Sequence, residues 1–398
     1  MKTSNTPTQS QQYDARFIAS IHEIEAEQWQ ALFDEDYPFT RHEFLATLED
    51  SDCTNGKTGW LTQHLLIYCD DVLVAAMPCY IKTHSYGEYI FDWSWADAYH
   101  KHGIEYYPKI VCAIPYTPAT GARLGLHSEF AAQTPAIILC VNAALAHLAQ
   151  KIGASNWQCL FPEKTFSDQL TAHSWLQRID TQFHWFNRDY QHFDDFLCQF
   201  NSRKRKNVVK ERRQVSNSDV TLAVVEGADI TPAIWQRFYL FYQLTYQKRS
   251  RNMGYLNQAF FESLSQVLPQ QVMMVVARNQ NEEKDENGEI VAAALYFKSA
   301  DTLYGRYWGC LEEQQFLHFE CCYYQGIEYC IKHQLSRFDA GAQGEHKIQR
   351  GFEPVTTYAN YHVLHPQFGP AIANFLQEEK AHIEQYMVAA RGKLPFKK

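Results

Sequence analysis

A short glycine-containing segment towards the end of the chain holds four side chains that could do chemistry. They lie in "GAQGEHKIQRGF" and are Glu345, His346, Lys347 and Arg350. A carboxylate or an imidazole can accept a proton, and the two basic side chains can bind a phosphate. The preceding Gly341 and Gly344 let a substrate approach backbone N–H groups, which can meet an oxyanion. We therefore predict catalysis and substrate binding here; the alternative is a β-turn with surface charges.

A second segment, residues 91–109, combines polar and aromatic side chains in a density that core strands seldom carry. Its candidates for lining a ligand site are Asp92, Trp93, Tyr107 and Lys109. The following loop, "TPATGARLG", precedes an apolar stretch typical of a helix, and helix N-termini bind anions. Gly121 in this loop is a candidate for donor binding. The alternative is an aromatic core followed by an ordinary turn.

A third segment, "LYGRYWGC", is predicted to be a strand. Because side chains alternate along a strand, Tyr304, Arg306 and Trp308 share one face, which we predict to bind substrate. The helix expected after it begins with His318 and Glu320, two candidates for proton transfer. Glu320 could instead act only on the helix dipole.

A fourth segment is strongly basic within an acidic protein. Residues 193–215 are predicted to form a helix whose exposed face carries Arg203, Lys206, Lys210 and Arg213 at spacings of three and four residues. The formal net charge of the whole chain is -9, so this excess of positive charge is local. It favours contact with phosphates or with an RNA backbone. The alternative is a solvated helix face.

Composition excludes several classes of protein. The 398 residues are 46% hydrophobic, which is enough to fold two domains and excludes global disorder. The polar N-terminus is not typical of a signal peptide, and no uninterrupted apolar run is long enough to cross a membrane. Eleven scattered cysteines indicate reduced core residues and a cytoplasmic protein, and no metal site is predicted. Nucleotide-binding P-loop, dinucleotide-binding and serine-nucleophile motifs are absent from the sequence.

The predicted elements occur in the same order in both halves of the chain. Each half has two helices, a pair of strands, a third strand, a long helix and a further strand. A last strand and a helix over residues 368–390 close the chain. The sequence therefore predicts an α+β protein with a disordered tail at residues 1–14, a first domain at 15–187 and a second domain at 188–398 that includes the basic helix and the C-terminal helix.

These blocks resemble the bacterial FemAB-like predicted N-acyltransferases, which are related to the Fem aminoacyltransferases. The resemblance covers about residues 15–397 and implies two tandem GNAT-like (acyl-CoA N-acyltransferase-like) domains. The Fem pattern of a strand, a glycine-rich turn, a basic residue and a Gly-Phe pair falls on Phe338, Gly341, Gly344, Lys347, Arg350, Gly351 and Phe352. The basic helix of that family falls on residues 203–213. The usual acyl-CoA loop is absent, although Thr120-Gly121-Ala122 occupies a plausible place for it.

The resemblance implies transfer of an acyl or aminoacyl group to an amine on a small phosphorylated or peptide-like acceptor, in cell-envelope metabolism. The expected acyl donor is aminoacyl-tRNA or acyl-CoA, with no tightly bound cofactor. The expected partners are the acceptor and, as a candidate, tRNA. The alternative function is a catalytically inactive GNAT-like module that binds a peptide-like or phosphorylated ligand.

Overall fold

The computed structural model of the protein describes residues 12–280, 288–342 and 344–397. Residues 1–11 of the predicted tail therefore lie outside the described part, and Tyr13 and Asp14 already belong to strand β1.

The first half of the chain contains both helices and strands. Its helices are α1 (Ala26–Gln30), α2 (His42–Asp50), α3 (Trp93–Lys101), α4 (Thr134–Ile152) and α5 (Lys164–Ala172). Its strands are β1 (Tyr13–Ile18), β2 (Trp60–Thr62), β3 (His64–Cys69), β4 (Val72–Met77), β5 (Cys79–Lys82), β6 (Lys109–Cys112), β7 (Gly125–Leu126), β8 (Asn156–Leu160) and β9 (Leu176–Phe186).

The second half repeats this alternation with longer strands. Its helices are α6 (Phe193–Cys198), α7 (Ser202–Ser216), α8 (Pro232–Ser250), α9 (Gln258–Val267), α10 (Leu317–Phe319), the π-helical turn η5 (Glu320–Tyr324), α11 (Gln325–Lys332), the 3-10 turn η6 (Glu345–Arg350) and α12 (Phe368–Arg391). Its strands are β10 (Val220–Glu226), β11 (Val272–Asn279), β12 (Glu289–Lys298), β13 (Thr302–Cys310), β14 (Arg337–Asp339) and β15 (Glu353–Val363).

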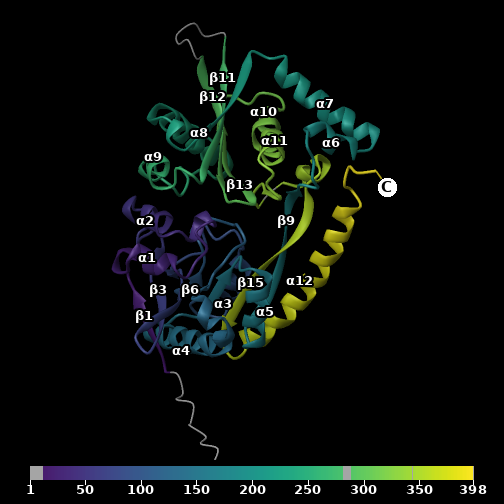
Figure 1. Ribbon diagram of the computed structural model, residues 1–398. Coiled ribbons are helices and arrows are strands. Elements are labelled where there is room, and N and C mark those ends of the chain that lie inside the picture. Colours follow the sequence, from purple (N-terminus) through teal and green to yellow (C-terminus); the bar gives the residue numbers. More distant parts are fainter. Residues whose placement is uncertain (1–11, 281–287, 343, 398) are drawn as a thin grey trace, which may run out of the picture.

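One sheet connects the two halves. Eleven strands follow the order β10-β11-β12-β13-β14-β9-β15-β8-β6-β5-β2, and a smaller sheet has the order β1-β3-β4-β7. β15 pairs with β8 and β9, so a strand from near the C-terminus completes the first half. Figure 1 shows β9 and β15 running between the two parts, with α12 (yellow) beside them. The predicted domain boundary between residues 187 and 188 directly follows β9. Because both halves contribute strands to one sheet, the structure does not test this boundary, and it stays a prediction.

The central strands of the second half are buried on both faces. In β11, Met274 packs with α8 and α9, whereas its neighbours Met273 and Val275 pack with η5 and α11. Figure 1 shows α8 and α9 on one side of β11–β13 and α10 and α11 on the other. This burial explains why β11 and β12 read as continuous apolar runs rather than alternating ones.

Aromatic packing joins the halves into one core. The ring of Phe39 lies 5.1 Å from that of Phe297, and the ring of Phe44 lies 5.9 Å from that of Phe260. Each pair has one member from each half. The halves therefore share an interface of packed aromatic side chains.

Helix α4 is the longest apolar helix of the first half. With the turn before it, Ser128–Ile152 is long and apolar enough by length and composition to cross a membrane, with a mean hydropathy of 1.4. Its buried side chains, including Ile137, Val141 and Leu145, pack with β3 and β4 in one core cluster. A core helix that covers a sheet passes the same test, and 39% of this apolar window is buried in the protein.

Candidate active site

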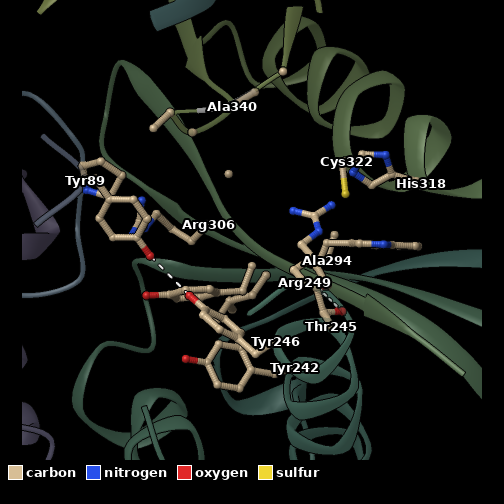
Figure 2. A pocket seen from close by; sticks show the side chains of 18 of the residues that line it. Tyr89, Tyr242, Thr245, Tyr246, Arg249, Ala294, Arg306, His318, Cys322 and Ala340 are labelled. Carbon is tan, nitrogen blue, oxygen red and sulfur yellow. Dashed lines mark hydrogen bonds between the residues drawn. The ribbon is translucent and has the colours of Figure 1, made fainter. Parts of the chain in front are cut away.

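A cavity of about 520 Å³ lies between the two halves, next to the point where β13 and β14 separate. Its walls come from Tyr89, Phe91 and Pro118 of the first half, and from α8, β12, β13, η5 and the turn after β14 of the second. Figure 2 shows side chains from these elements facing one space. We call it the central cavity.

The separation of β13 from β14 has a local cause. The two strands run parallel from Thr302 opposite Arg337 to Tyr304 opposite Asp339, and β14 ends there. The chain then turns at Gly341, which has a φ of +84° and donates its N–H to the Asp339 carboxylate at 2.9 Å. Strand β14 is therefore only three residues long, because this left-handed turn ends it.

Strand β13 also contains a bulge within the cavity wall. Gly305 pairs with Tyr296 and Tyr307 with Leu295, so Arg306 is an extra residue with no partner in β12. Bulges of this kind redirect a side chain and are common beside active sites. Arg306 and Trp308 both line the cavity, whereas Tyr304 is buried between Tyr37 and Phe39.

The charged groups of the cavity are basic. Arg306 lines one side and donates to the carbonyl of Tyr116, and Arg249, from the last turn of α8, lines another (Figure 2). Arg249 has no ion pair among the residues that the structure describes, and the described lining contains no Asp or Glu. A guanidinium in such a cavity lacks a counter-charge, so the cavity suits a substrate with an anionic group.

Two histidines of the cavity are held in the neutral form. Burial, His346 and Arg249 lower the pKa of His318 to about 3. Loss of hydration, Arg350 and Lys347 lower the pKa of His346 to about 4. His346 is also linked through Nε2 to the hydroxyl of Tyr323 at 2.8 Å. Neutral imidazoles can accept protons at neutral pH, so the structure brings two of the predicted proton-transfer residues to the cavity.

The other predicted catalytic residues lie elsewhere. Glu345 faces α12 and accepts a hydrogen bond from the hydroxyl of Tyr386 at 2.7 Å. Glu320 is buried, with Arg212 of α7 at 2.8 Å. Neither carboxylate lines the central cavity, although Glu320 lines a second cavity under α7.

The basic residues of the glycine-containing segment point into the protein. Lys347 is buried and donates to the carbonyl of Gly341 at 2.6 Å; burial lowers its pKa to about 8. Arg350 pairs with Glu211 of α7 and stacks on Phe319 at 3.5 Å. These two residues support the wall of the cavity, whereas Gly341 and Gly344 line it.

The residues predicted from the segment 91–109 form a buried polar network rather than a cavity wall. The Lys109 ammonium lies 2.5 Å from Asp92 and 2.8 Å from Glu88, and all three side chains are fully buried. Burial alone lowers the pKa of Lys109, but the two carboxylates raise it above its ordinary value. Tyr107 joins the network through Ser85 at 2.8 Å. The structure does not bring Asp92, Tyr107 or Lys109 to the central cavity.

Removing the cation of this network should destabilise the protein strongly. In a Lys109→Met variant, Asp92 and Glu88 lose their buried counter-charge, and we expect the free energy of unfolding to fall by about 3–5 kcal/mol. Urea denaturation measures this loss. The control is Lys101→Met, because Lys101 forms an exposed pair with Asp97 and should cost less than about 1 kcal/mol. A loss as small as that of the control would contradict the structural role of the network. If the variant does not fold, adding Asp92→Asn and Glu88→Gln should restore folding.

Two further candidates have surface or packing positions. Trp93 is exposed, and its ring lies 5.6 Å from that of Phe91, which lines the cavity. Gly121 has no space for a side chain, because a Cβ there would lie 2.3 Å from the ring of Tyr37. The part of the loop around Gly121 is therefore packed inside the first half, and of the whole loop it is Pro118 that lines the central cavity.

The helix predicted over residues 193–215 is divided into α6 and α7, because the side chain of Asn201 caps the start of a new helix, and its basic part is α7. Arg203, Lys206, Lys210 and Arg213 are exposed, and none has an ion pair among the described residues. The acidic and basic residues on the inner face, Glu211 and Arg212, make the pairs to Arg350 and Glu320 described above. The four exposed cations are called the basic stripe.

Several cavity residues were not predicted from sequence. Arg249, Tyr246 and Tyr89 line the cavity, and the hydroxyls of Tyr246 and Tyr89 lie 3.3 Å apart, across the two halves (Figure 2). The only sequence signal for Arg249 was its position at the end of an apolar helix. A basic residue is common there because it interacts with the last carbonyl groups of the helix. Within the described ranges, no group of three or more His, Cys, Asp and Glu side chains is arranged to hold a metal ion.

Solved structures share this arrangement along the whole chain. FemX has 11% sequence identity and a TM-score of 0.53, and the match covers 90% of this chain and 100% of that chain. The C-terminal domain (DUF2156) of a putative lysylphosphatidylglycerol synthetase from Agrobacterium fabrum has 10% identity and a TM-score of 0.51, with 91% and 97% covered. A tandem GNAT protein from the clavulanic acid biosynthesis pathway has 10% identity and a TM-score of 0.50, with 89% and 99% covered. These likenesses confirm the predicted α+β fold of two tandem GNAT-like domains.

Comparison with sequences gives a family. No curated protein matches the chain. The family model of FemAB-like proteins, described as peptidoglycan biosynthesis/recognition, matches residues 20–398. Since that match covers nearly every residue, the chain belongs to the FemAB-like family.

Proposed function

We propose that this protein is an N-acyltransferase that passes an acyl or aminoacyl group to an amine on a small phosphorylated or peptide-like acceptor. The observation that carries the proposal is the central cavity, where β13 continues past the end of β14. The cavity is lined by two guanidinium groups, of Arg249 and Arg306, and by the neutral imidazoles of His318 and His346. Membership of the FemAB-like family supports the same class of reaction and a role in cell-envelope metabolism.

The reaction needs no covalent enzyme intermediate. The neutral amine attacks the acyl carbonyl carbon, the new C–N bond forms, and the bond from that carbon to the donor's sulfur or oxygen breaks. The amine gives its proton to the acceptor assigned below, which passes it on to the leaving thiolate or alkoxide. Between Gly305 and Cys310, β13 has no strand on the side that β14 has left, so N–H groups there are the candidates for meeting the oxyanion.

The positive charge of the cavity assists loss of the amine proton. Arg249 and Arg306 disfavour a second cation nearby and should lower the pKa of a bound ammonium. We assign proton acceptance to His346, directly or through water, because it lines the cavity and is neutral. Tyr323 would hold the ring in place.

For the donor, two observations favour aminoacyl-tRNA over acyl-CoA. The basic stripe of α7 suits an RNA backbone. The loop around Gly121, where an acyl-CoA phosphate site was a candidate, is packed against Tyr37. Acyl-CoA stays the second candidate donor.

The proposal is tested by supplying each donor with an isotopically labelled acyl group and measuring products by mass spectrometry. Amines that carry a phosphate or a short peptide serve as acceptors. We expect an acceptor heavier by one acyl group, with aminoacyl-tRNA as the better donor and acetyl-CoA as a weak competitor. If acceptors stabilise the protein against thermal unfolding but neither donor gives product, the protein is instead a binding module. The absence of a carboxylate from the described cavity lining favours that second function.

A further inference from the structure

A second cavity lies on the other side of the π-helical turn η5, which forms part of the wall of the central cavity. It has a volume of about 590 Å³ and lies between α6, α7, β10 and the η5–α11 segment. Glu320 and Gln325 of that segment line the second cavity, whereas Cys322 and Tyr323 line the central one. The acyl-transfer reaction proposed above makes no use of this second cavity.

The second cavity is continuous with the basic stripe. Arg213 belongs to both, and the other three cations of the stripe extend from it along the exposed face of α7. Ten residues of helix span about 15 Å, so the stripe is a narrow row of positive charge with a cavity at one end. Such a row complements a chain of phosphates rather than a single one.

The walls of the second cavity suit a nucleobase better than an alkyl chain. Phe193 lies on one wall with the Arg212 guanidinium 4.4 Å from its ring centre, and both are planar groups on which a base can stack. Asp194 and Gln325 add hydrogen-bonding groups to the lining, whereas the Ser216 hydroxyl donates to the carbonyl of Arg213 in its own helix. An alkyl chain would cover the Asp194 carboxylate and the Gln325 side-chain carbonyl without offering them a hydrogen bond.

The same surface does not fit a membrane. A helix that lies on a membrane carries large apolar side chains such as Trp, Phe and Leu beside its cations. On α7, the described large apolar side chain that is exposed is Val209. The charge of the stripe therefore lacks the apolar partner that a lipid surface requires.

We propose that the basic stripe and the second cavity together bind single-stranded RNA, with phosphates on the stripe and one base in the cavity. This inference deepens the proposed function, on which its biological role rests, because an RNA-borne acyl donor needs a site outside the reaction cavity. It assigns the RNA to α7, with the central cavity left free on the other side of η5.

Binding is measured by fluorescence anisotropy with a labelled oligoadenylate of about 12 nucleotides, a length within the range that such sites cover. Four phosphate contacts predict a log–log salt slope of about -2.8 and roughly 50-fold weaker binding at 200 mM than at 50 mM salt. Changing Lys206 and Lys210 together to Ala should flatten the slope by about 1.4. Ser216→Phe, which fills the second cavity, should weaken binding about tenfold without changing the slope.

Two matched variants and two ligands complete the experiment. Lys151→Ala on α4, at the far end of the molecule in Figure 1, and Ser216→Ala should bind as the wild type does. The inference is overturned if the oligonucleotide does not bind at about 50 mM salt, or if the double variant keeps the wild-type slope. Tighter binding to vesicles of anionic phospholipid, or equal binding of free AMP, also overturns it. The oligonucleotide carries no amino acid, so its binding does not depend on acyl transfer. If the protein binds RNA but transfers no acyl group, the proposed donor is rejected and the proposed RNA site still holds.

Discussion

Replacing His346 by alanine is expected to lower kcat by about 100-fold or more, within the range that a positioned proton acceptor contributes. The imidazole lies at the cavity, and its pKa of about 4 keeps it neutral at pH 7. Since this pKa is below the ordinary value, kcat/KM should not fall as the pH is lowered through 6.5, because the acid limb that His346 imposes on it lies near pH 4. Steady-state kinetics from pH 8 down to about pH 5 measure the loss in kcat and show whether a limb near pH 6.5 is present.

The neighbouring residue provides a matched control. Glu345 lies one position away, faces Tyr386 on α12 and does not line the cavity, so Glu345→Gln should keep kcat within about threefold. Full activity in His346→Ala would remove His346 from the role of proton acceptor. Loss of activity in Glu345→Gln but not in His346→Ala would make Glu345 the proton acceptor.

Replacing Arg306 by methionine is expected to lower kcat/KM by about 10²–10³, the usual cost of removing one electrostatic partner of a transition state. Arg306 is the bulge residue of β13, and its guanidinium is one of two cations in the cavity. A loss mainly in kcat would show that it meets the developing oxyanion, whereas a loss mainly in KM would show that it anchors an anionic group of the substrate. Arg306→Lys should recover part of the loss, because lysine keeps the charge but not the planar fork.

The control for Arg306 is an arginine of the same sheet. Arg278 of β11 lines neither of the two cavities, so Arg278→Gln should leave kcat/KM unchanged. Circular dichroism and thermal unfolding show whether Arg306→Met still folds, which matters because its guanidinium also donates to Tyr116 of the first half. Unchanged kcat/KM in a folded Arg306→Met protein would contradict a role for Arg306 in the reaction.

Most of the fold follows from local patterns in the sequence. The runs around Val275 and Ala293 predicted two strands because β-branched and small apolar residues dominate them. Helix α8 follows a local pattern too, because it begins after a Thr cap with Pro at its first position. The exchange of β15 into the first half was not predictable, because it is set by long-range pairing and not by any local signal.

The candidate site was predicted only in part, for a physical reason. Arg306 and His346 lie at the cavity as expected, although a bulge and not simple strand alternation directs Arg306, and Tyr304 does not share its position. Asp92 and Lys109 have equally reactive side chains, yet they neutralise each other inside the first half. Sequence shows that charged groups are near one another along the chain, but it does not show whether they face a ligand or one another. Arg249 belongs to the site because α8 packs against β13, which is again a tertiary contact.

The central claim is that acyl transfer takes place in the cavity beside the separated ends of β13 and β14. It is tested most directly by filling that cavity and measuring product formation by mass spectrometry with the donor that the wild type uses. Ala340 lies on the cavity wall (Figure 2), and Ala146 is an exposed residue of α4. We predict that Ala340→Trp lowers the rate at least about 100-fold, because misplacing a substrate by one ångström has that cost, while Ala146→Trp keeps the wild-type rate. An Ala340→Trp protein that unfolds at the wild-type temperature and transfers the acyl group at the wild-type rate would contradict the claim.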